Sequence, residues 1–411
     1  TIRLYDTATG KELNPIQEQV ADPNNKEAIF IASGRGFGGR PILAFSPDGS
    51  LIATVGSPAV ANANGIVVGR PGMAGPGSMI RLWNVAMGKQ VRQFETVQKG
   101  ITALTFAPDG RTIITANSDS TISVWEAVTG KECLVIKLKT DAGAEQPNNP
   151  AVQGFIAVQR GQFANYSIAV SADGRTLAVG ADQSLRLFDL TSGKELGEFK
   201  GHQGVLMDVV FAADNQTVIT GSADTTAVVW DGKRFIKKDQ PANVQLDGKK
   251  LDDLWNDLTA EPTKGYQAVA TLAGASKQVP ALFAERVKPS AGTDPKKIEQ
   301  MIVDLDSNKF DARQKATEDL EKLGEQAKPA LEKVLEGQPA LETRQRVERL
   351  LERLVTNAAP PADVVRNVRA VWVLEKIGTP EAREVLQTLA KGAPGDKLTR
   401  EAEVALKRLA K

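Results

Sequence analysis

Histidine and cysteine, which supply most metal ligands and many catalytic nucleophiles, occur once each in this chain of 411 residues. They are His202 and Cys133. A structural zinc site takes four Cys or His ligands and a disulfide takes two cysteines, so this chain alone supplies neither. Catalysis would have to use carboxylates, hydroxyls, lysines or His202. We predict no catalytic or metal-binding residue, with a general-base role for His202 as the alternative to a structural one.

A glycine-rich motif at 34–39 fits the G-x-G-x-x-G fingerprint of dinucleotide-binding proteins. In that fingerprint the third glycine opens a helix whose N-terminus meets the pyrophosphate. Here Arg40 and Pro41 follow, and then the apolar run of residues 42–45, which is typical of a strand. We therefore predict a glycine-rich loop between strands and no cofactor.

A second motif, at 304–315, has Asp or Asn at positions 1, 3 and 5 of a calcium-binding loop. Lys309 stands where the loop needs glycine, and Lys315 stands where calcium needs a bidentate glutamate. The motif therefore does not predict calcium binding. We expect Asp306 and Ser307 to cap the helix that follows.

The charges are balanced overall but unevenly spread along the chain. The 51 Lys+Arg and 50 Asp+Glu residues give a net charge of +1, so we expect no nucleic acid as partner. No run is long and apolar enough to predict a membrane segment. Residues 247–411 hold 28 basic and 27 acidic residues, about a third of that stretch, and the other 23 and 23 make up under a fifth of residues 1–246.

The composition changes at the same place, near Leu246. The first half is rich in Thr, Val, Ile and Gly, which is typical of strands and turns, and the second in Ala, Leu, Glu, Lys and Arg, which is typical of helices. The polar, proline-containing stretch 237–250 indicates a linker. We predict a β domain over residues 1–236 and an α-helical domain over 251–411.

The first half repeats a short pattern of strand and turn signals. An apolar run followed by an Asp-Gly or Asp-Asn turn recurs along this half. An apolar-aromatic-acidic triplet recurs downstream as LYD, LWN, VWE, LFD and VWD, in which Asn or Glu can replace Asp. Four of these five triplets are followed by a Gly-Lys turn. The Asp turns are at Asp48, Asp109, Asp173 and Asp214. At an offset of 105, Asp109, Thr115, Asp119 and Trp125 align without a gap with Asp214, Thr220, Asp224 and Trp230. Short strands at this spacing predict small sheets that stack around an axis.

These residues resemble the WD-repeat β-propeller family over about residues 1–235. The resemblance rests on the Asp-Gly turn, the aromatic-acidic dipeptide, the Gly-Lys turn and the pair Gly201-His202. It implies a structural tetrad of side chains that hydrogen-bond across the last blade: His202, Thr220 (or Ser222), Asp224 and Trp230.

The same resemblance identifies signature residues in the other units. They are Trp83, Asp119, Trp125 and Asp189. The unit around Trp125 has Val97 where His202 would align, so it lacks the tetrad, and we expect this blade to be less rigid.

The strands are expected to form about four to five blades, whereas seven are usual for the family. Because the chain begins with Thr in the middle of an expected strand, we expect N-terminal blades to be missing. A bacterial cytoplasmic or an exported protein would both fit. Two long insertions, 58–78 and 140–160, are binding elements or disordered, with disorder favoured for the first.

The second half shows helical periodicity. Pro295 follows Asp294 and opens an amphipathic segment, an arrangement typical of a capped helix start. The sequence LEKLG at 320–324 returns as LEKIG at 374–378, an offset of 54, and residues 342–354 resemble 398–409. Two tryptophans, Trp255 and Trp372, lie on apolar stripes and are expected to pack.

Helical units of this period stack into a solenoid, and residues 250–411 resemble HEAT-like helical repeats. The order of propeller and helical tail, with LWNDL at the junction, is similar to a group of planctomycete WD-repeat proteins. The predicted fold class is therefore a β + α multidomain protein, a partial WD-repeat β-propeller followed by an α-helical HEAT-like domain.

Three functions are compatible with this organisation. The favoured one is a non-catalytic interaction scaffold that binds a protein or peptide, so we predict that the chain is not an enzyme. The alternative is the sensory or regulatory C-terminal part of a longer bacterial signalling protein, such as a kinase or sigma factor. A catalytic propeller is the third, and it would need clustered acidic groups or a metal in the central channel.

Overall fold

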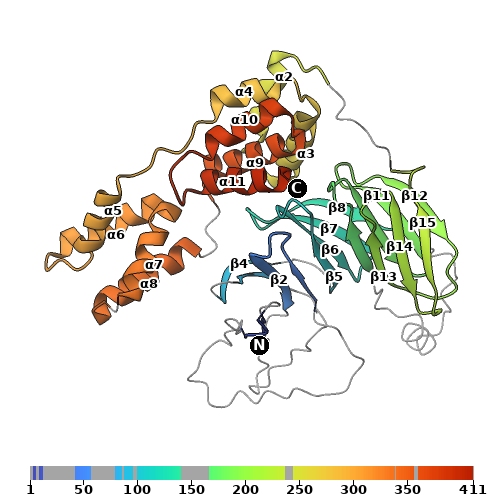
Figure 1. Ribbon diagram of the computed structural model, residues 1–411, viewed down its shortest axis with the longest axis horizontal. Coiled ribbons are helices and arrows are strands. Elements are labelled where there is room, and N and C mark those ends of the chain that lie inside the picture. Colours follow the sequence, from blue (N-terminus) through green and yellow to red (C-terminus); the bar gives the residue numbers. More distant parts are fainter. Residues whose placement is uncertain are drawn as a thin grey trace, which may run out of the picture. The chain divides into compact units, whose positions relative to one another are not determined.

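The computed structural model describes residues 3–5, 9–12, 42–56, 79–85, 88–95, 100–139, 166–236, 244–337, 339–355 and 360–410 (Figure 1). They belong to two compact units, Thr1–Lys238 and Asp239–Lys411. The first unit holds the strands and the second holds the helices. The motif at 34–39, Val97 and the insertions 58–78 and 140–160 lie outside the described residues.

The first unit contains four antiparallel sheets, each built from consecutive strands. The first sheet is β1 (Leu43–Phe45), β2 (Leu51–Gly56), β3 (Met79–Asn84) and β4 (Lys89–Glu95), and the second is β5 (Ile101–Phe106), β6 (Thr112–Asn117), β7 (Thr121–Glu126) and β8 (Lys131–Lys137). The third is β9 (Ser167–Val170), β10 (Thr176–Ala181), β11 (Ser184–Asp189) and β12 (Glu195–Lys200), and the fourth is β13 (Leu206–Phe211), β14 (Thr217–Ser222) and β15 (Ala227–Asp231). An isolated bridge joins Tyr5 and Glu12. The predicted partial β-propeller is thereby confirmed.

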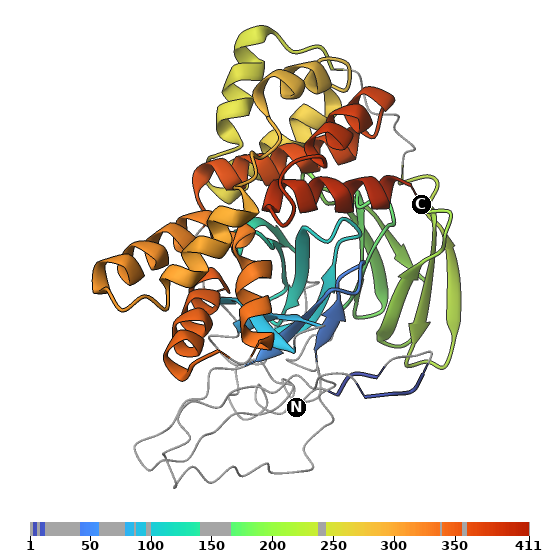
Figure 2. The ribbon, with the colours of Figure 1, turned by 60° about the vertical axis from the view of Figure 1, so that its left-hand side comes forward.

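The sheets pack face to face in chain order (Figure 1, Figure 2). The first two share a core that includes Ala53, Ile80, Leu82 and Phe94 from the first and Ile101, Leu104, Phe106, Ile113 and Trp125 from the second. The last two share one that includes Ala178, Leu185 and Leu187 from the third and Leu206, Val209 and Val218 from the fourth. Each small sheet buries its apolar faces only with its neighbours, as stacked blades require.

The Asp turns explain why the repeat is readable in the sequence. In the second sheet Asp109 Oδ1 accepts a hydrogen bond from Arg111 N at 2.9 Å, which closes the turn between β5 and β6. Gly110 has a φ of 65°, and the corresponding residue of the fourth sheet, Asn215, has a φ of 59°. Glycine and asparagine are the residues that adopt this left-handed conformation most readily, which is why the turns read Asp-Gly or Asp-Asn.

The second unit contains ten described α-helices and a short 3-10 helix. They are α2 (Gly248–Asp257), α3 (Pro262–Gly274), α4 (Val279–Arg286), α5 (Pro295–Asp304), α6 (Phe310–Leu323), the 3-10 helix η1 (Gly324–Gln326), α7 (Lys328–Glu336), α8 (Leu341–Val355), α9 (Ala362–Ile377), α10 (Pro380–Leu389) and α11 (Lys397–Leu409). None of the described helices is long and apolar enough to cross a membrane.

One helix start follows the predicted capping, one departs from it, and α2 begins inside the expected linker. Asp294 accepts a hydrogen bond from Lys296 N and caps α5 as predicted. Helix α2 begins at Gly248, so the last three residues of the expected linker, 237–250, are helical. The prediction that Asp306 and Ser307 cap α6 is wrong, because the N-cap position is Lys309. Asp306 instead accepts a hydrogen bond from Thr343 on α8.

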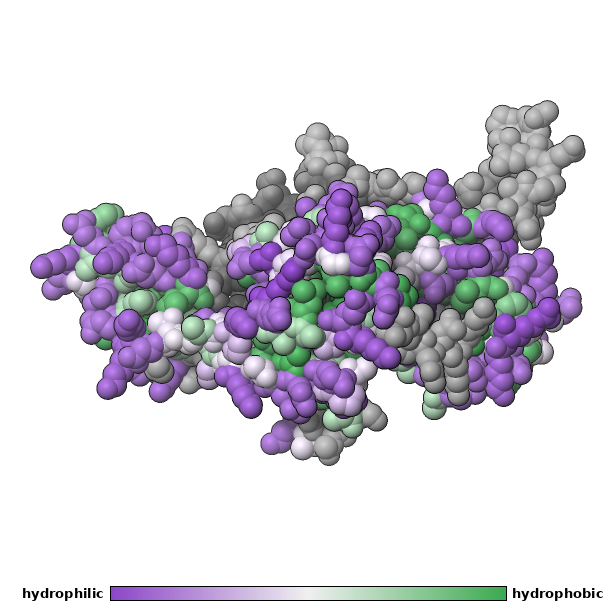
Figure 3. Space-filling view, turned by 90° about the horizontal axis from the view of Figure 1, so that it is seen from above, coloured by the Kyte–Doolittle hydropathy of each residue, from purple (hydrophilic) through white to green (hydrophobic). Residues whose placement is uncertain are grey.

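The helices form two hydrophobic cores. One joins α2–α4 with α9–α11, and the other joins α5–α8. Trp372 is 2% exposed in the first core, and Trp255 packs against that core, so both predicted packing roles are confirmed. In Figure 3 the helices α5–α8 are mainly hydrophilic on the face shown, in keeping with the dense charge of this half of the sequence.

Candidate functional site

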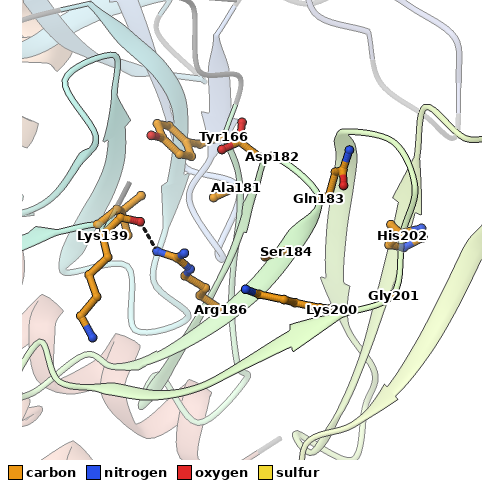
Figure 4. A pocket seen from close by; sticks show the side chains of 11 residues that line it. Lys139, Tyr166, Ala181, Asp182, Gln183, Ser184, Arg186, Lys200, Gly201 and His202 are labelled. Atoms are coloured by element: carbon orange, nitrogen blue, oxygen red, sulfur yellow. Dashed lines mark hydrogen bonds between the residues drawn. The ribbon is translucent and has the colours of Figure 1, made fainter. Parts of the chain in front are cut away.

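A cleft of about 230 Å³ lies between the end of β8 and the third sheet (Figure 4). Its lining comes from Leu138 and Lys139 after β8, Tyr166 before β9, residues 181–184 and Arg186 around the β10–β11 turn, and residues 200–202 at the end of β12. The volume is below the range of about 300–1,000 Å³ that is typical of small-molecule sites. The cleft therefore suits a single side chain better than a whole ligand.

Arg186 is the buried charge of this cleft, with its side chain 8% exposed. Its Nε and Nη2 donate to Oε1 of Glu198 at 3.2 and 3.1 Å, and its Nη1 donates to the backbone carbonyl of Lys139 (Figure 4). Burial opposes ionisation of Glu198, but the hydrogen bond and charge of Arg186 outweigh it and lower the pKa of Glu198. This pair is therefore ionised and fixes the wall of the cleft.

Two lysines lie at the exposed rim of the cleft. Lys139 pairs with Glu195, and Lys200 pairs with Glu198, each at 3.5 Å. Their side chains are 82% and 64% exposed, so these pairs contribute little to stability and exchange readily with water or a partner.

Tyr166 is the aromatic member of the lining. Its hydroxyl donates to Ser120 Oγ at 2.9 Å. Burial raises the pKa of Tyr166, and the nearby carboxylates of Asp182 and Asp119 raise it further. The phenol therefore remains protonated and acts as a hydrogen-bond donor rather than as a base.

His202 lies at the end of the cleft, and both of its ring nitrogens have partners within the fourth sheet. Nε2 lies 2.7 Å from Thr220 Oγ1, the same oxygen to which Trp230 Nε1 donates at 2.7 Å. Nδ1 lies 3.2 Å from Asp224 Oδ2 and 3.0 Å from Thr226 Oγ1. The structure thus brings four predicted tetrad residues into one hydrogen-bonded chain.

The direction of each bond follows from what the end groups can do. An ionised Asp224 only accepts, so His202 Nδ1 carries the proton and donates to it. The Thr220 hydroxyl, which accepts from Trp230, then donates to Nε2. This tautomer is assigned from the hydrogen-bond network. It leaves no ring nitrogen of His202 available to take a proton from a substrate.

Asp224 is held by its own loop as well as by His202. Its carboxylate accepts from the Thr226 hydroxyl at 2.5 Å and from the amides of Gln203 at 2.7 Å and Thr226 at 2.9 Å. The Thr226 hydroxyl is the largest cause of a pKa well below the usual value for Asp224. Ser222, the alternative to Thr220, accepts from Asp224 N at 3.2 Å instead.

The signature tryptophans repeat one bond of this network. Trp83 Nε1 donates to Thr54 Oγ1 at 2.9 Å, and Trp125 Nε1 donates to Thr115 Oγ1 at 3.0 Å. The same bond, tryptophan of the third strand to threonine of the second, therefore occurs in the first, second and fourth sheets.

The signature aspartates serve turns. Asp119 Oδ1 accepts from the Thr121 hydroxyl at 2.6 Å, as Asp224 does from Thr226. Asp189 Oδ1 accepts from the amide and hydroxyl of Ser192, both at 2.7 Å, at the turn after β11. Asp189 therefore holds its own turn, whereas Asp224 also bonds to His202.

Sequence reasoning missed several residues of these networks, among them Thr226 and Thr54. Thr226 contacts both His202 and Asp224, and Thr54 receives the Trp83 bond. A signal for Thr226 was present, because threonine stands two residues after the aspartate in both aligned units. A signal for Thr54 was present too, because it stands six residues after Asp48, as Thr115 does after Asp109 and Thr220 does after Asp214.

The chemistry of the arrangement is that of a fixed scaffold. Over the part of the chain that the structure describes, no group of three or more His, Cys, Asp or Glu is placed to hold a metal ion. Cys133 is buried in β8, and its thiol donates to Val124 O at 3.2 Å. The cleft has two exposed lysines, Lys139 and Lys200, at its rim, and its wall is fixed by the buried pair of Arg186 and Glu198.

Three segments of the chain match the family model described as "WD domain, G-beta repeat", at residues 88–126, 159–189 and 193–231. The first unit therefore contains WD repeats, and its strands are those of a partial WD-type propeller.

Curated relatives are similar over about a third of the chain. Apoptotic protease-activating factor 1 of Mus musculus is 26% identical over 168 residues, which cover 37% of this chain and 14% of the relative. Target of rapamycin complex subunit LST8 of Saccharomyces cerevisiae is 28% identical over 138 residues, 32% of this chain and 38% of the relative. Guanine nucleotide-binding protein subunit beta of Zea mays is 22% identical over 156 residues, 36% of this chain and 38% of the relative.

The chain thus spans well under half the length of these relatives. The match is to WD repeats, and it gives no support to the alternative that the chain is the regulatory part of a kinase or sigma factor.

Proposed function

We propose that this protein is a non-catalytic scaffold that binds protein or peptide partners through its WD-repeat unit. The observation that carries the proposal is the closed network of His202, whose two ring nitrogens are both engaged by side chains of the same sheet. The chain's single histidine serves the fold. The WD repeats support the proposal, since two of the similar proteins are by name subunits of larger assemblies.

The lysine rim of the cleft is the surface we propose for this contact. Lys139 and Lys200 are exposed, and Gln183 and Tyr166 add hydrogen-bonding groups beside them. An acidic side chain of a partner entering the cleft would exchange with Glu195 and Glu198, whose pairs with the lysines are weak.

The helical unit is proposed to be a HEAT-like repeat array that adds a second binding surface. Its support is an internal repeat of three helices: α6, α7 and α8 correspond to α9, α10 and α11. Leu320 and Leu374 are both 0% exposed, and the glycines that end α6 and α9, Gly324 and Gly378, have φ values of 58° and 63°. We also propose that the chain belongs with the planctomycete WD-repeat group, on the order of WD repeats and helices and on LWNDL at 254–258 between them.

The test is affinity capture with the whole chain and with two charge-reversal variants. Lys139→Glu with Lys200→Glu reverses the rim, and the matched control Lys264→Glu reverses a 60% exposed lysine on α3. We expect a reproducible partner that binds the wild type and the control and is lost with the rim variant. Equal capture by all three would contradict the rim, and turnover of a small molecule without any partner would contradict the scaffold function.

A further inference from the structure

The described helices of the second unit divide into two groups, and no residue of one group's hydrophobic core belongs to the other core. Helices α2–α4 and α9–α11 form the flanking module, and α5–α8, which lie between them in the sequence, form the inserted module. Stacked helical repeats normally bury one continuous core, because each repeat covers the apolar face of the next. Over the described residues that continuity is interrupted where the inserted module meets the flanking one.

The chain enters the inserted module through residues 287–294, which have no regular secondary structure. Val287, 4% exposed, is the last residue before this crossing that belongs to the first core, and Ile298 is the first that belongs to the second. Hinges between two packed bodies are usually a few loop residues of this kind, which absorb the change in backbone angles.

The two ends of the crossing are fastened to different modules. The carbonyl of Ser290 accepts a hydrogen bond at 3.0 Å from the amide of Ala393, which precedes α11 in the flanking module. Asp294, at the other end, caps α5 of the inserted module. Only residues 291–293 lie between these attachments, and Gly292 is the one among them that tolerates the widest range of backbone angles. A hinge in this crossing is therefore centred on Gly292.

One side chain of the inserted module reaches the flanking module beside this crossing. Gln326, in η1, donates through Nε2 to Ser290 Oγ and to Asp396 Oδ2, both at 3.3 Å. Its Oε1 accepts from Thr293 N at 3.4 Å. Asp396 is the N-cap of α11, and its other oxygen accepts from Leu398 N at 2.9 Å. Gln326 therefore ties the start of α11 to residues on both sides of Gly292.

The backbone beside Gln326 is firmly held, whereas the bonds of its side chain are weak. The next residue, Ala327, is 0% exposed in the core of the inserted module, so η1 moves with that module. The three bonds of Gln326 are longer than the range of about 2.7–3.2 Å that is usual for N–H···O. Hydrogen bonds of a neutral amide contribute little net stability and open readily.

We propose that α5–α8 swing as one body about Gly292, and that Gln326 is the latch that holds the closed arrangement. In the open arrangement Gln326, Ser290 and Asp396 bond to water instead. Each module keeps its own core, so the motion requires no unfolding. The hinge goes beyond the binding function proposed above and does not depend on it. A partner that contacts both modules would select one arrangement and shift the population toward it.

The separation of the modules can be measured in the whole chain by double electron–electron resonance between two spin labels. The labels are attached through Lys333→Cys on α7 and Gln387→Cys on α10, both exposed positions. The native Cys133 is 2% exposed, and treatment of the unsubstituted chain with the label checks that it does not react. We expect one dominant, narrow distance for the doubly labelled chain.

Gln326→Ala in the doubly labelled chain removes all three bonds of the latch. We expect the population at other distances to rise about tenfold, the effect of losing one or two net hydrogen bonds. The matched control is Gln314→Ala on α6, which removes a 2.9 Å bond to Glu318 within the same helix. We expect the control to leave the distance distribution unchanged, and circular dichroism checks that each variant stays folded.

A reversal of donor and acceptor separates a direct bond from a general disturbance of η1. Gln326→Glu places a second carboxylate against Asp396 and should open the latch. Adding Asp396→Asn should close it again, because the new amide donates to the new carboxylate while its oxygen still caps α11. Asp396→Asn alone sets two amide donors against each other and should open the latch as well.

Two results would overturn the proposal. Equal distance distributions in the doubly labelled chain, Gln326→Ala and Gln326→Glu would show that Gln326 does not hold the modules together. Broadening by Gln326→Glu that Asp396→Asn fails to reverse would show that the bond between these two side chains is not the latch.

Discussion

The hydroxyl of Thr220 connects two aromatic side chains, because it accepts from Trp230 and donates to His202. Thr115 holds the equivalent position in the second sheet and, among the described residues, bonds only to the tryptophan. Both threonines are 0% exposed, so the two sites differ by one hydrogen bond in a similarly buried setting. They form a natural pair for measuring what the histidine adds.

We expect Thr220→Val to destabilise its sheet more than Thr115→Val does, by about 1 kcal/mol, the net value of one further hydrogen bond. Hydrogen exchange of the β14 and β6 amides measures the local opening free energy without assuming that the whole chain unfolds in one step. Equal losses at the two sites would show that the His202 bond contributes nothing to the stability of the fourth sheet.

Asp224 predicts a pH dependence of the same sheet. Its pKa in the folded state is lowered from 3.8, mainly by the Thr226 hydroxyl, so ionisation of Asp224 stabilises the folded sheet above pH 3.8. That stabilisation is lost as the pH falls from 3.8 toward the folded-state value. Wild type should therefore exceed Asp224→Asn in β14 amide protection at neutral pH, and the two should converge at acidic pH. A constant difference across this range would contradict the linkage.

The sequence predicted most residues of the His202 network but not every hydrogen bond between them. The gap-free alignment of the two units placed Thr220, Asp224 and Trp230 at the positions that the structure brings together. It could not choose between Thr220 and Ser222, because both lie on β14 and which hydroxyl meets His202 depends on the β13–β14–β15 register. It also gave no hint of the cleft, whose Arg186–Glu198 pair joins neighbouring strands without a recognisable motif.

At the scale of elements, helix α9 holds the C-terminal end of α2 through one buried side chain. Arg369 is 1% exposed, and its Nη1 donates to the carbonyls of Leu258 and Ala260, both at 2.8 Å. These carbonyls lie just past the end of α2, where helix carbonyls need donors from elsewhere and a cation is favoured.

Arg369→Met should therefore destabilise the helical unit by about 3 kcal/mol, since it removes two hydrogen bonds from a charged donor. The control Arg344→Met removes an exposed pair with Glu348 on α8 and should change stability by about 0.5 kcal/mol or less. Urea unfolding followed by the helical circular dichroism signal measures both. Similar losses for the two variants would contradict the assigned role of Arg369.

Gly265 on α3 makes room for the same guanidinium. A Cβ at this position would lie 2.1 Å from Arg369 Nη1, far inside van der Waals contact. Gly265→Ala ordinarily stabilises a helix by about 1 kcal/mol through propensity. Here we expect it to lower the urea midpoint, and combining it with Arg369→Ala should restore that propensity gain. A stabilised Gly265→Ala single variant would show that the close approach is not real.

The start of a helix could be predicted where the residues that define it lie close together in the sequence. Helix α5 begins at Asp294 and Pro295 as the sequence predicts, because both signals act within one turn. The capping role expected of Asp306 failed because Thr343, 37 positions later, takes its carboxylate. A long-range partner of this kind leaves no local pattern in the sequence.

On the scale of the whole molecule, the contrast in charge density between the two halves has a structural counterpart. The first unit buries its side chains between stacked sheets, and the second has two cores of its own. The partial propeller and the helical part could be predicted because repetition multiplies weak signals. The sequence did not show that the helices divide between two cores, since α5–α8 and α9–α11 carry the same apolar spacing.

The helical unit should therefore fold by itself. The residues of both of its cores lie between Leu246 and Leu409, inside the unit Asp239–Lys411. A unit that contains its own core and satisfies its own helix ends, as Arg369 does for α2, is expected to be an independent domain. A protein that comprises residues 239–411 should give the well-dispersed amide NMR spectrum of a folded protein. Collapsed, poorly dispersed peaks from residues 239–411 alone would show that this unit needs the WD-repeat unit to fold.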